Sequence, residues 1–162
     1  MAVTDVHKDP EALTMTITAE FDAPVERTWQ VWEDPRQLER WWGPPVYPAT
    51  VVEHDLTPGG RVAYYMTGPE GDRHHGWWRV IAVEVPHALE FEDGFADEAG
   101  NPDPAMPTTI ARITLHERAD GGTRMSIETT FRSLEQMEKL ITMGMEEGSM
   151  LAIGQIDGLL AA

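Results

Sequence analysis

The segment Ser133–Ala162, with the sequence SLEQMEKLITMGMEEGSMLAIGQIDGLLAA, decides the fold because it carries the longest helical pattern in the chain. Its apolar and small residues recur at steps of three and four, which is the spacing of one face of an α-helix. Ser133 followed three positions later by Gln136 is a capping-box sequence, which marks the start of a helix. We therefore predict one unbroken helix from about Ser133 to Leu160.

Upstream of this helix the sequence is typical of an antiparallel sheet of six or seven strands. Alternating apolar and polar residues from Leu13 to Phe21 predict a half-buried strand. Turn signals about ten residues apart then favour a meander of further strands. These strands are predicted at Val46–Leu56, Arg61–Thr67, His74–Val85, Ala88–Phe95, Thr109–Glu117 and Thr123–Phe131.

Two short helices are predicted directly after the first strand, between Pro24 and Trp41. Val25, Trp29 and Trp32 follow helical spacing, and Pro35 is suited to the first turn of a second helix. Residues 1–11 are polar and are predicted to be a loose lead-in. A chain of 162 residues can bury one sizeable core, so we expect residues 12–162 to form a single α+β domain.

A pocket, rather than a catalytic motif, is the main indication of function. A sheet that curls around one long helix can leave a space between the two. We expect the mouth of this pocket near Trp41, Trp42 and the proline-rich loop 96–107, which is long enough to act as a lid. The alternation of the strands and the helical spacing select the side chains that face the space. The predicted ligand-binding residues are Trp41, Tyr64, Met66, His75, Trp78, Phe91, Met125, Ile127, Met137, Ile141, Gly144 and Gly148.

Two glycines inside the terminal helix admit two interpretations. Gly144 and Gly148 would each cost the helix about 1 kcal/mol relative to alanine. They could allow the helix and the sheet to approach closely, or they could leave room for a ligand. Methionines on the same surfaces, Met66, Met125, Met137 and Met143, would supply an adaptable wall.

The composition excludes several classes of function. Twelve Lys and Arg residues against 28 Asp and Glu residues give a net charge of −16, which argues against nucleic acids and anionic membranes as partners. The chain has no cysteine, so disulfides and thiolate metal sites are excluded. No apolar run is long enough to enter a membrane, and the first ten residues do not form a signal peptide. We therefore expect a cytoplasmic protein, and a homodimer stays open.

Several motifs together resemble the START-like (SRPBCC) superfamily, and more narrowly the bacterial homologues of the heat-shock-protein-ninety ATPase activator. The motifs are PVERTWQVW at 24–32, LERWWGP at 38–44, DLTPGGR at 55–61, MTGPEG at 66–71 and GMEEG at 144–148. The resemblance covers about residues 12–160. It implies a helix-grip fold, in which a curved antiparallel sheet wraps around a long C-terminal helix.

The resemblance does not specify a function, because one frame serves lipid carriers, cyclases, dehydratase-like enzymes and chaperone cofactors. The eukaryotic activator has a separate N-terminal domain that contributes to chaperone binding. A chain of 162 residues leaves no room for that domain, so we do not expect a chaperone partner.

Candidate catalytic groups are few. The adjacent pair His74 and His75 would point to opposite faces of a strand, and no histidine spacing suits a metal, so no metal or cofactor is predicted. Tyr64, His75 and Arg61 are the candidates for polar contact with a ligand, although Arg61 is better suited to a surface ion pair.

The favoured hypothesis is the binding of a small hydrophobic molecule, lipid-like or aromatic, without chemistry. One alternative is an enzyme acting on a hydrophobic substrate by cyclisation or dehydration, with Tyr64 or His75 as the acid–base group. The other alternative is an interaction protein of the chaperone system.

Overall fold

Eight antiparallel strands form one sheet in the computed structural model, which describes residues 2–161. The order across the sheet is β1-β2-β8-β7-β6-β5-β4-β3. The strands are β1 (Val3–Asp9), β2 (Thr14–Phe21), β3 (Ala49–His54), β4 (Arg61–Thr67), β5 (Arg73–Glu84), β6 (Ala88–Phe95), β7 (Thr109–Glu117) and β8 (Thr123–Phe131). The predicted α+β class and antiparallel arrangement are therefore confirmed.

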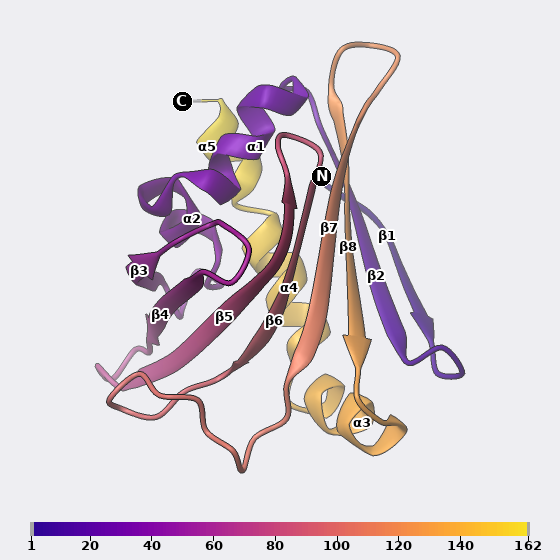
Figure 1. Ribbon diagram of the computed structural model, residues 1–162. Helices are drawn as coiled ribbons and strands as arrows, with labels where there is room; N and C mark the ends of the chain where they lie inside the picture. Colours follow the sequence, from indigo (N-terminus) through magenta and orange to yellow (C-terminus); the bar gives the residue numbers. More distant parts are fainter. Residues whose placement is uncertain (1, 162) are drawn as a thin grey trace.

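The helices pack on one face of this curved sheet (Figure 1). They are α1 (Val25–Glu33), α2 (Pro35–Trp41), α3 (Leu134–Thr142), α4 (Met145–Ile153) and α5 (Ile156–Leu160). In the figure α4 and α5 run across the concave face, α1 and α2 lie beside α5, and α3 lies near the end of β8. The side chain of Gln155, between α4 and α5, donates to the carbonyl oxygen of Gly43 at 2.7 Å and so ties this junction to the chain after α2.

The prediction of one unbroken terminal helix was wrong. Gly144 has a φ of 97°, a left-handed conformation that ends α3 and begins α4. A residue without a Cβ adopts this conformation at little cost, so the chain can turn here. A second break follows at Gly154. The predicted start at Ser133 was correct, since its hydroxyl accepts a hydrogen bond from the backbone N–H of Gln136.

The prediction of a loose lead-in over residues 1–11 was also wrong, because Val3–Asp9 form strand β1. This strand lies at the edge of the sheet and pairs with β2. Its half-buried side chains include Val3 and Val6, while its neighbours are exposed and polar. An edge strand with so few buried side chains leaves a weak signal in the sequence. The two short helices consequently follow the second strand, and the sheet has eight strands where six or seven were predicted.

Other strand boundaries agree closely with the prediction. Arg61–Thr67, Ala88–Phe95, Thr109–Glu117 and Thr123–Phe131 match at both ends, whereas the predicted strand Val46–Leu56 is shorter, at Ala49–His54. Among the described residues, no helix is long and apolar enough to cross a membrane.

Candidate ligand-binding cavity

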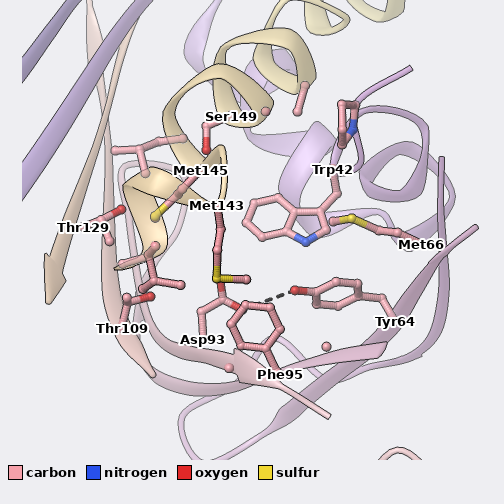
Figure 2. A pocket seen from close by; sticks show the side chains of 18 of the residues that line it. Trp42, Tyr64, Met66, Asp93, Phe95, Thr109, Thr129, Met143, Met145 and Ser149 are labelled. Carbon is pink, nitrogen blue, oxygen red and sulfur yellow. Dashed lines mark hydrogen bonds between the residues drawn. The ribbon is translucent and has the colours of Figure 1, made fainter. Parts of the chain in front are cut away.

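A cavity of about 380 Å³ lies between the concave face of the sheet and the helices α3 and α4. Figure 2 shows its walls, with Thr109 and Thr129 on the sheet side and Met145 and Ser149 on the helix side. The predicted position of a pocket, between the sheet and the terminal helical segment, agrees with this cavity. Its most exposed lining residues are His74 and Met143, so the cavity opens near the start of β5 and the α3–α4 junction.

The cavity occupies one end of the concave face, and the other end is filled. Each inner strand contributes lining residues from the same end of the sheet. The sheet residues on the inner face that line it include Met15, Ile17, Tyr64, Met66, Phe91, Asp93, Phe95, Thr109, Ala111, Ile127 and Thr129. At the opposite end the same strands carry close-packed side chains, including Trp78, Val80, Leu89, Ile113, Leu115 and Met125, all fully buried.

The helix side of the cavity is lined by residues with small or flexible side chains. Gly144 and Gly148 border the space, and a Cβ added at either position would meet no atom within 4 Å. Close approach of helix and sheet therefore does not explain these glycines. Met143 and Met145 also line the cavity, and their thioether chains can adapt to an occupant.

One hydrogen bond joins two polar side chains of the wall. The hydroxyl of Tyr64 on β4 donates to Oδ1 of Asp93 on β6 at 3.3 Å, as the dashed line in Figure 2 shows. Strand β5 lies between β4 and β6, and its residue opposite Tyr64 is Gly76. A Cβ at Gly76 would overlap the ring and the hydroxyl of Tyr64. The missing side chain at position 76 thus lets Tyr64 cross β5 to reach Asp93.

The environment of this pair changes the proton affinity of both groups. Burial raises the pKa of Asp93 to about 7, although hydrogen bonds from Tyr64 and the backbone of Gly94 oppose the rise. Burial, followed by the Asp93 carboxylate, raises the pKa of Tyr64 well above its ordinary value, and the indole N–H groups of Trp42 and Trp78 oppose it. An acid of this kind exchanges its proton near neutral pH, which is unusual for an aspartate.

Eight of the twelve predicted ligand-binding residues border the cavity. They are Trp41, Tyr64, Met66, His75, Phe91, Ile127, Gly144 and Gly148. His75 is placed less favourably than Tyr64, because its ring packs against Tyr65 with 5.6 Å between the ring centroids. For Gly148 the interpretation that remains is the one in which the glycine leaves space, whereas Gly144 is explained by its left-handed conformation at the break between α3 and α4.

Four predicted residues do not line the cavity. Trp78 faces inward as expected but stacks on Phe91, with the ring centroids 3.8 Å apart, and fills the closed end. Met125 is fully buried at that same end, and Met137 is buried in the core on α3. Ile141 packs against the core from α3. Arg61, considered for polar contact, is not in the lining and forms an ion pair with Glu53 at 3.7 Å.

Asp93 is the important residue that the sequence analysis missed. Leu89, Phe91 and Asp93 are alternate residues of β6, so all three side chains lie on the same, inner face of the sheet. A carboxylate after two apolar inward residues is the signal that could have identified it. Pro44, Thr109 and Thr129 were also left out of the predicted site and line the cavity, as does Trp42, which was expected only at the mouth of the pocket. Pro107 is the one member of the loop 96–107 in the lining.

No metal site accompanies the cavity within residues 2–161, where no three His, Asp or Glu side chains gather in a way that could hold an ion. The titratable residues that border the cavity are Tyr64, His74, His75 and Asp93, and the ring of His75 packs against Tyr65. The wall can therefore offer hydrogen bonds and one exchangeable carboxyl proton to an occupant.

The chain belongs to the family of Activator of Hsp90 ATPase homolog 1-like proteins, whose model matches residues 22–161. Its fold is the helix-grip fold that the sequence motifs implied. No curated protein matches the chain significantly.

Solved structures of two bacterial proteins are similar to this chain over nearly its whole length. A crystal structure of a Mycobacterium smegmatis protein is 53% identical with a TM-score of 0.90, covering 98% of this chain and 96% of that one. A solution structure of an Arthrobacter aurescens protein is 55% identical with a TM-score of 0.93, covering 98% and 92%. A Staphylococcus epidermidis protein at 24% identity and a TM-score of 0.84, covering 98% and 94%, shares the fold.

Proposed function

We propose that this protein binds a small, largely apolar molecule in the cavity between the sheet and helices α3 and α4. The observation that carries the proposal is the unfilled space itself, about 380 Å³ beside a close-packed core. This volume falls within the range of about 300–1,000 Å³ that is usual for ligand pockets. Protein interiors otherwise leave few voids larger than a water molecule.

The energetic cost of the space supports a functional role. The unfilled space forgoes the van der Waals contacts that close packing would give to its mostly apolar lining. Larger side chains at Gly148, where a Cβ would meet nothing within 4 Å, could fill part of it. Glycine at position 148 weakens the helix but leaves room for an occupant, and this supports a binding site.

Calorimetric titration with naphthalene, an apolar probe that carries no hydrogen-bonding group, tests the proposal. We expect saturable binding with one molecule per chain, accompanied by quenching of tryptophan fluorescence because Trp42 lies in the wall. Native mass spectrometry of the freshly purified protein should also detect a bound small molecule. A protein that carries no such molecule and does not bind the probe would contradict the proposal.

A second candidate function is proton transfer on a hydrophobic substrate, and the Tyr64–Asp93 pair favours it. A general base works best when its pKa lies near the working pH, as burial arranges for Asp93 at about 7. The candidate acid–base group is therefore Asp93, whereas Tyr64 and His75 were the candidates predicted from the sequence.

Proton exchange on 2-tetralone, an apolar bicyclic ketone, tests this second function without knowledge of the natural substrate. In heavy water the Asp93 carboxylate would remove a proton from the carbon next to the carbonyl group, and a deuteron would return to that carbon. We expect proton NMR to show exchange faster than in buffer, and the Asp93→Leu variant to lose the acceleration. Exchange at the buffer rate with bound ketone would leave binding as the function.

A further inference from the structure

Asp93 places a carboxylate deep in the protein but open to the cavity. Burial is the main cause of its raised pKa, so little bulk water reaches it. Its side chain is nevertheless only half-buried, because it borders the cavity. Within the described residues, the closed and unpaired polar atoms of the wall are the indole nitrogens of Trp32 and Trp42, and no oxygen of Asp93 is among them. The open part of this carboxylate therefore faces the space that a ligand would occupy.

The Asp93 carboxylate can accept more hydrogen bonds than the protein gives it. Tyr64 donates to Oδ1 at 3.3 Å, and the backbone of Gly94 is the other donor that lowers the pKa of Asp93. The two oxygens of a carboxylate together offer about four acceptor positions. An acceptor position is therefore left for a donor on a ligand, and the closed indole nitrogens are not needed for it.

No cation balances the negative charge of Asp93. Both groups that lower its pKa are uncharged hydrogen-bond donors. Of the described residues that line the cavity, none is a lysine or an arginine. A carboxylate in such surroundings is costly to ionise, and a cation beside it would remove that cost.

Three aromatic side chains of the wall adjoin this carboxylate. Phe91 and Phe95 stand two positions before and after Asp93 on β6, so the three side chains share the inner face of the strand. Tyr64 reaches Asp93 from β4, and Figure 2 shows Tyr64, Phe95 and Asp93 in one part of the wall. The faces of aromatic rings attract cations, whereas they give no comparable attraction to a neutral hydroxyl group. Asp93 and its aromatic neighbours thus have the chemistry of a site for an organic cation.

We propose that Asp93 is a subsite for an ammonium group on an otherwise apolar ligand. The ammonium group donates a charge-assisted hydrogen bond to the carboxylate, and the apolar body of the ligand fills the space between the sheet and α4. An alcohol would donate a hydrogen bond but leave the charge unbalanced, and a carboxylic acid would be repelled. This inference rests on the proposed binding function and adds the chemical class of the ligand, an apolar amine.

Three probes of the same shape test the subsite by calorimetry at about pH 8, where Asp93, with a pKa of about 7, is ionised and an alkylamine is protonated. They are 2-(aminomethyl)naphthalene, 2-naphthalenemethanol and 2-ethylnaphthalene, whose side groups end in an ammonium, a hydroxyl and a methyl group. We expect the amine to bind at least about tenfold more tightly than either of the others, as suits a hydrogen bond between two charged groups.

The pKa of Asp93 supplies a second readout, at the site itself. A bound cation favours the charged carboxylate, so saturation with the amine should lower this pKa below about 7, whereas 2-ethylnaphthalene should not lower it. Carbon NMR titration of the Asp93 carboxyl group measures the shift. The other titratable residues at the cavity are Tyr64 on β4 and His74 and His75 on β5, and the described lining residues of α3 and α4 include none. Because both probes are titrated in the same protein, protonation of these residues cancels in the comparison.

Two variants that each remove one negative charge identify the residue responsible. Asp93→Asn keeps the shape of the side chain and should abolish the preference for the amine, while continued binding of 2-ethylnaphthalene shows that the variant is folded. Glu90→Gln, on the same strand but on its opposite face, should keep the full preference. This control separates the subsite from a general attraction between the amine and a protein of net charge −16.

Each outcome decides the question. Equal affinities of the three probes would overturn the subsite and leave the proposed apolar binding intact. An alcohol that binds as tightly as the amine would overturn it in favour of a neutral donor. A preference for the amine that survives in Asp93→Asn, or a pKa of Asp93 that the amine does not lower, would also overturn it. Failure of all three probes to bind would overturn both the subsite and the proposed function.

Discussion

The ring of Tyr64 lies over Gly76, and this contact brings the tyrosine hydroxyl to a carboxylate two strands away. Tyr64 and Gly76 are paired directly across β4 and β5. The hydroxyl continues past Gly76 to Oδ1 of Asp93 on β6. A glycine in a strand interior usually weakens the strand, and it often marks a place where other groups approach closely. Here the group that approaches Gly76 is the ring of Tyr64, which forms part of the cavity wall.

Gly76→Ala should separate Tyr64 from Asp93, because the new methyl group would occupy the position of the tyrosine ring. We expect the pKa of Asp93 to rise above about 7, since the hydrogen bond from Tyr64 now lowers it. Overpacking should cost roughly 1–3 kcal/mol of stability. Carbon NMR titration of the Asp93 carboxyl group and thermal unfolding measure the two effects.

Tyr64→Phe serves as the companion to that variant. It removes the hydroxyl without adding volume, so the pKa of Asp93 should rise as it does in Gly76→Ala with less loss of stability. An unchanged pKa in both variants would mean that the hydrogen bond between Tyr64 and Asp93 is absent in solution.

Asp93→Asn should be more stable than the parent protein at alkaline pH. The folded protein holds a proton on Asp93 up to about pH 7, whereas the unfolded chain releases it near the ordinary value of 3.8. Between these two pH values the folded state binds more protons than the unfolded state, so the free energy of unfolding falls as the pH rises. At roughly 1.4 kcal/mol per pH unit, the total loss is at most about 4 kcal/mol. Because the asparagine side chain cannot ionise, the Asp93→Asn variant does not lose this stability as the pH rises.

Urea unfolding from pH 4 to 9 measures that difference. The stability of Asp93→Asn relative to the parent should increase with pH through this window and level off above about pH 7. Tyr64, His74 and His75 also border the cavity, but they are present in both proteins and cancel in the comparison. A difference that does not change with pH would show that the carboxyl group titrates normally.

Gly148→Leu should fill part of the cavity without damaging the fold. The position lies inside α4 and faces open space, so helix propensity should improve by up to about 1 kcal/mol while overpacking is avoided. The melting temperature should be kept or slightly raised. Naphthalene should bind about tenfold more weakly or worse, which corresponds to about 1.4 kcal/mol or more.

The matched control is Gly158→Leu on α5. This glycine also has no atom within 4 Å of its virtual Cβ, but it is exposed and lies away from the cavity. It should leave naphthalene binding unchanged. A clear drop in the melting temperature of Gly148→Leu would instead show that Gly148 is packed against the sheet in solution.

Gly144→Ala and Gly148→Ala should change stability in opposite directions. Gly144 has a φ of 97°, so a Cβ there should cost about 1–2 kcal/mol of backbone strain. Gly148 lies in a regular helix, and alanine there should gain up to about 1 kcal/mol. Thermal unfolding would then place the two melting temperatures on either side of the parent. If Gly144→Ala were as stable as Gly148→Ala, the break between α3 and α4 would not exist in solution.

The strands and their inward faces could be predicted because both depend on local alternation. Tyr64 and Met66, Phe91, and Ile127 all lie on the faces that parity assigned. Asp93 follows the same parity, so its position could have been predicted although its role could not. The proton affinity of a carboxylate depends on the side chains packed around it, and those come from strands far apart in the sequence.

The edge strand β1 and the break at Gly144 were not predictable by the same means. An edge strand is stabilised by its partner β2, and few of its own side chains are buried, so local pattern says little about it. A glycine at helical spacing is compatible with a continuous helix and with a turn. Only the packing of α3 near β8 and of α4 across the concave face selects the turn.

The sequence by itself determined the antiparallel sheet, the helical C-terminal segment and the face on which a pocket could form, because periodicity sets which side of an element is buried. Only the tertiary structure decided which end of that face stays open. Trp78 and Met125 point the same way as Tyr64 and Ile127, yet the first two are fully buried and the last two line the cavity. The reason is that α1 and α5 pack at one end of the sheet, while the glycines of α3–α4 leave the other end unfilled.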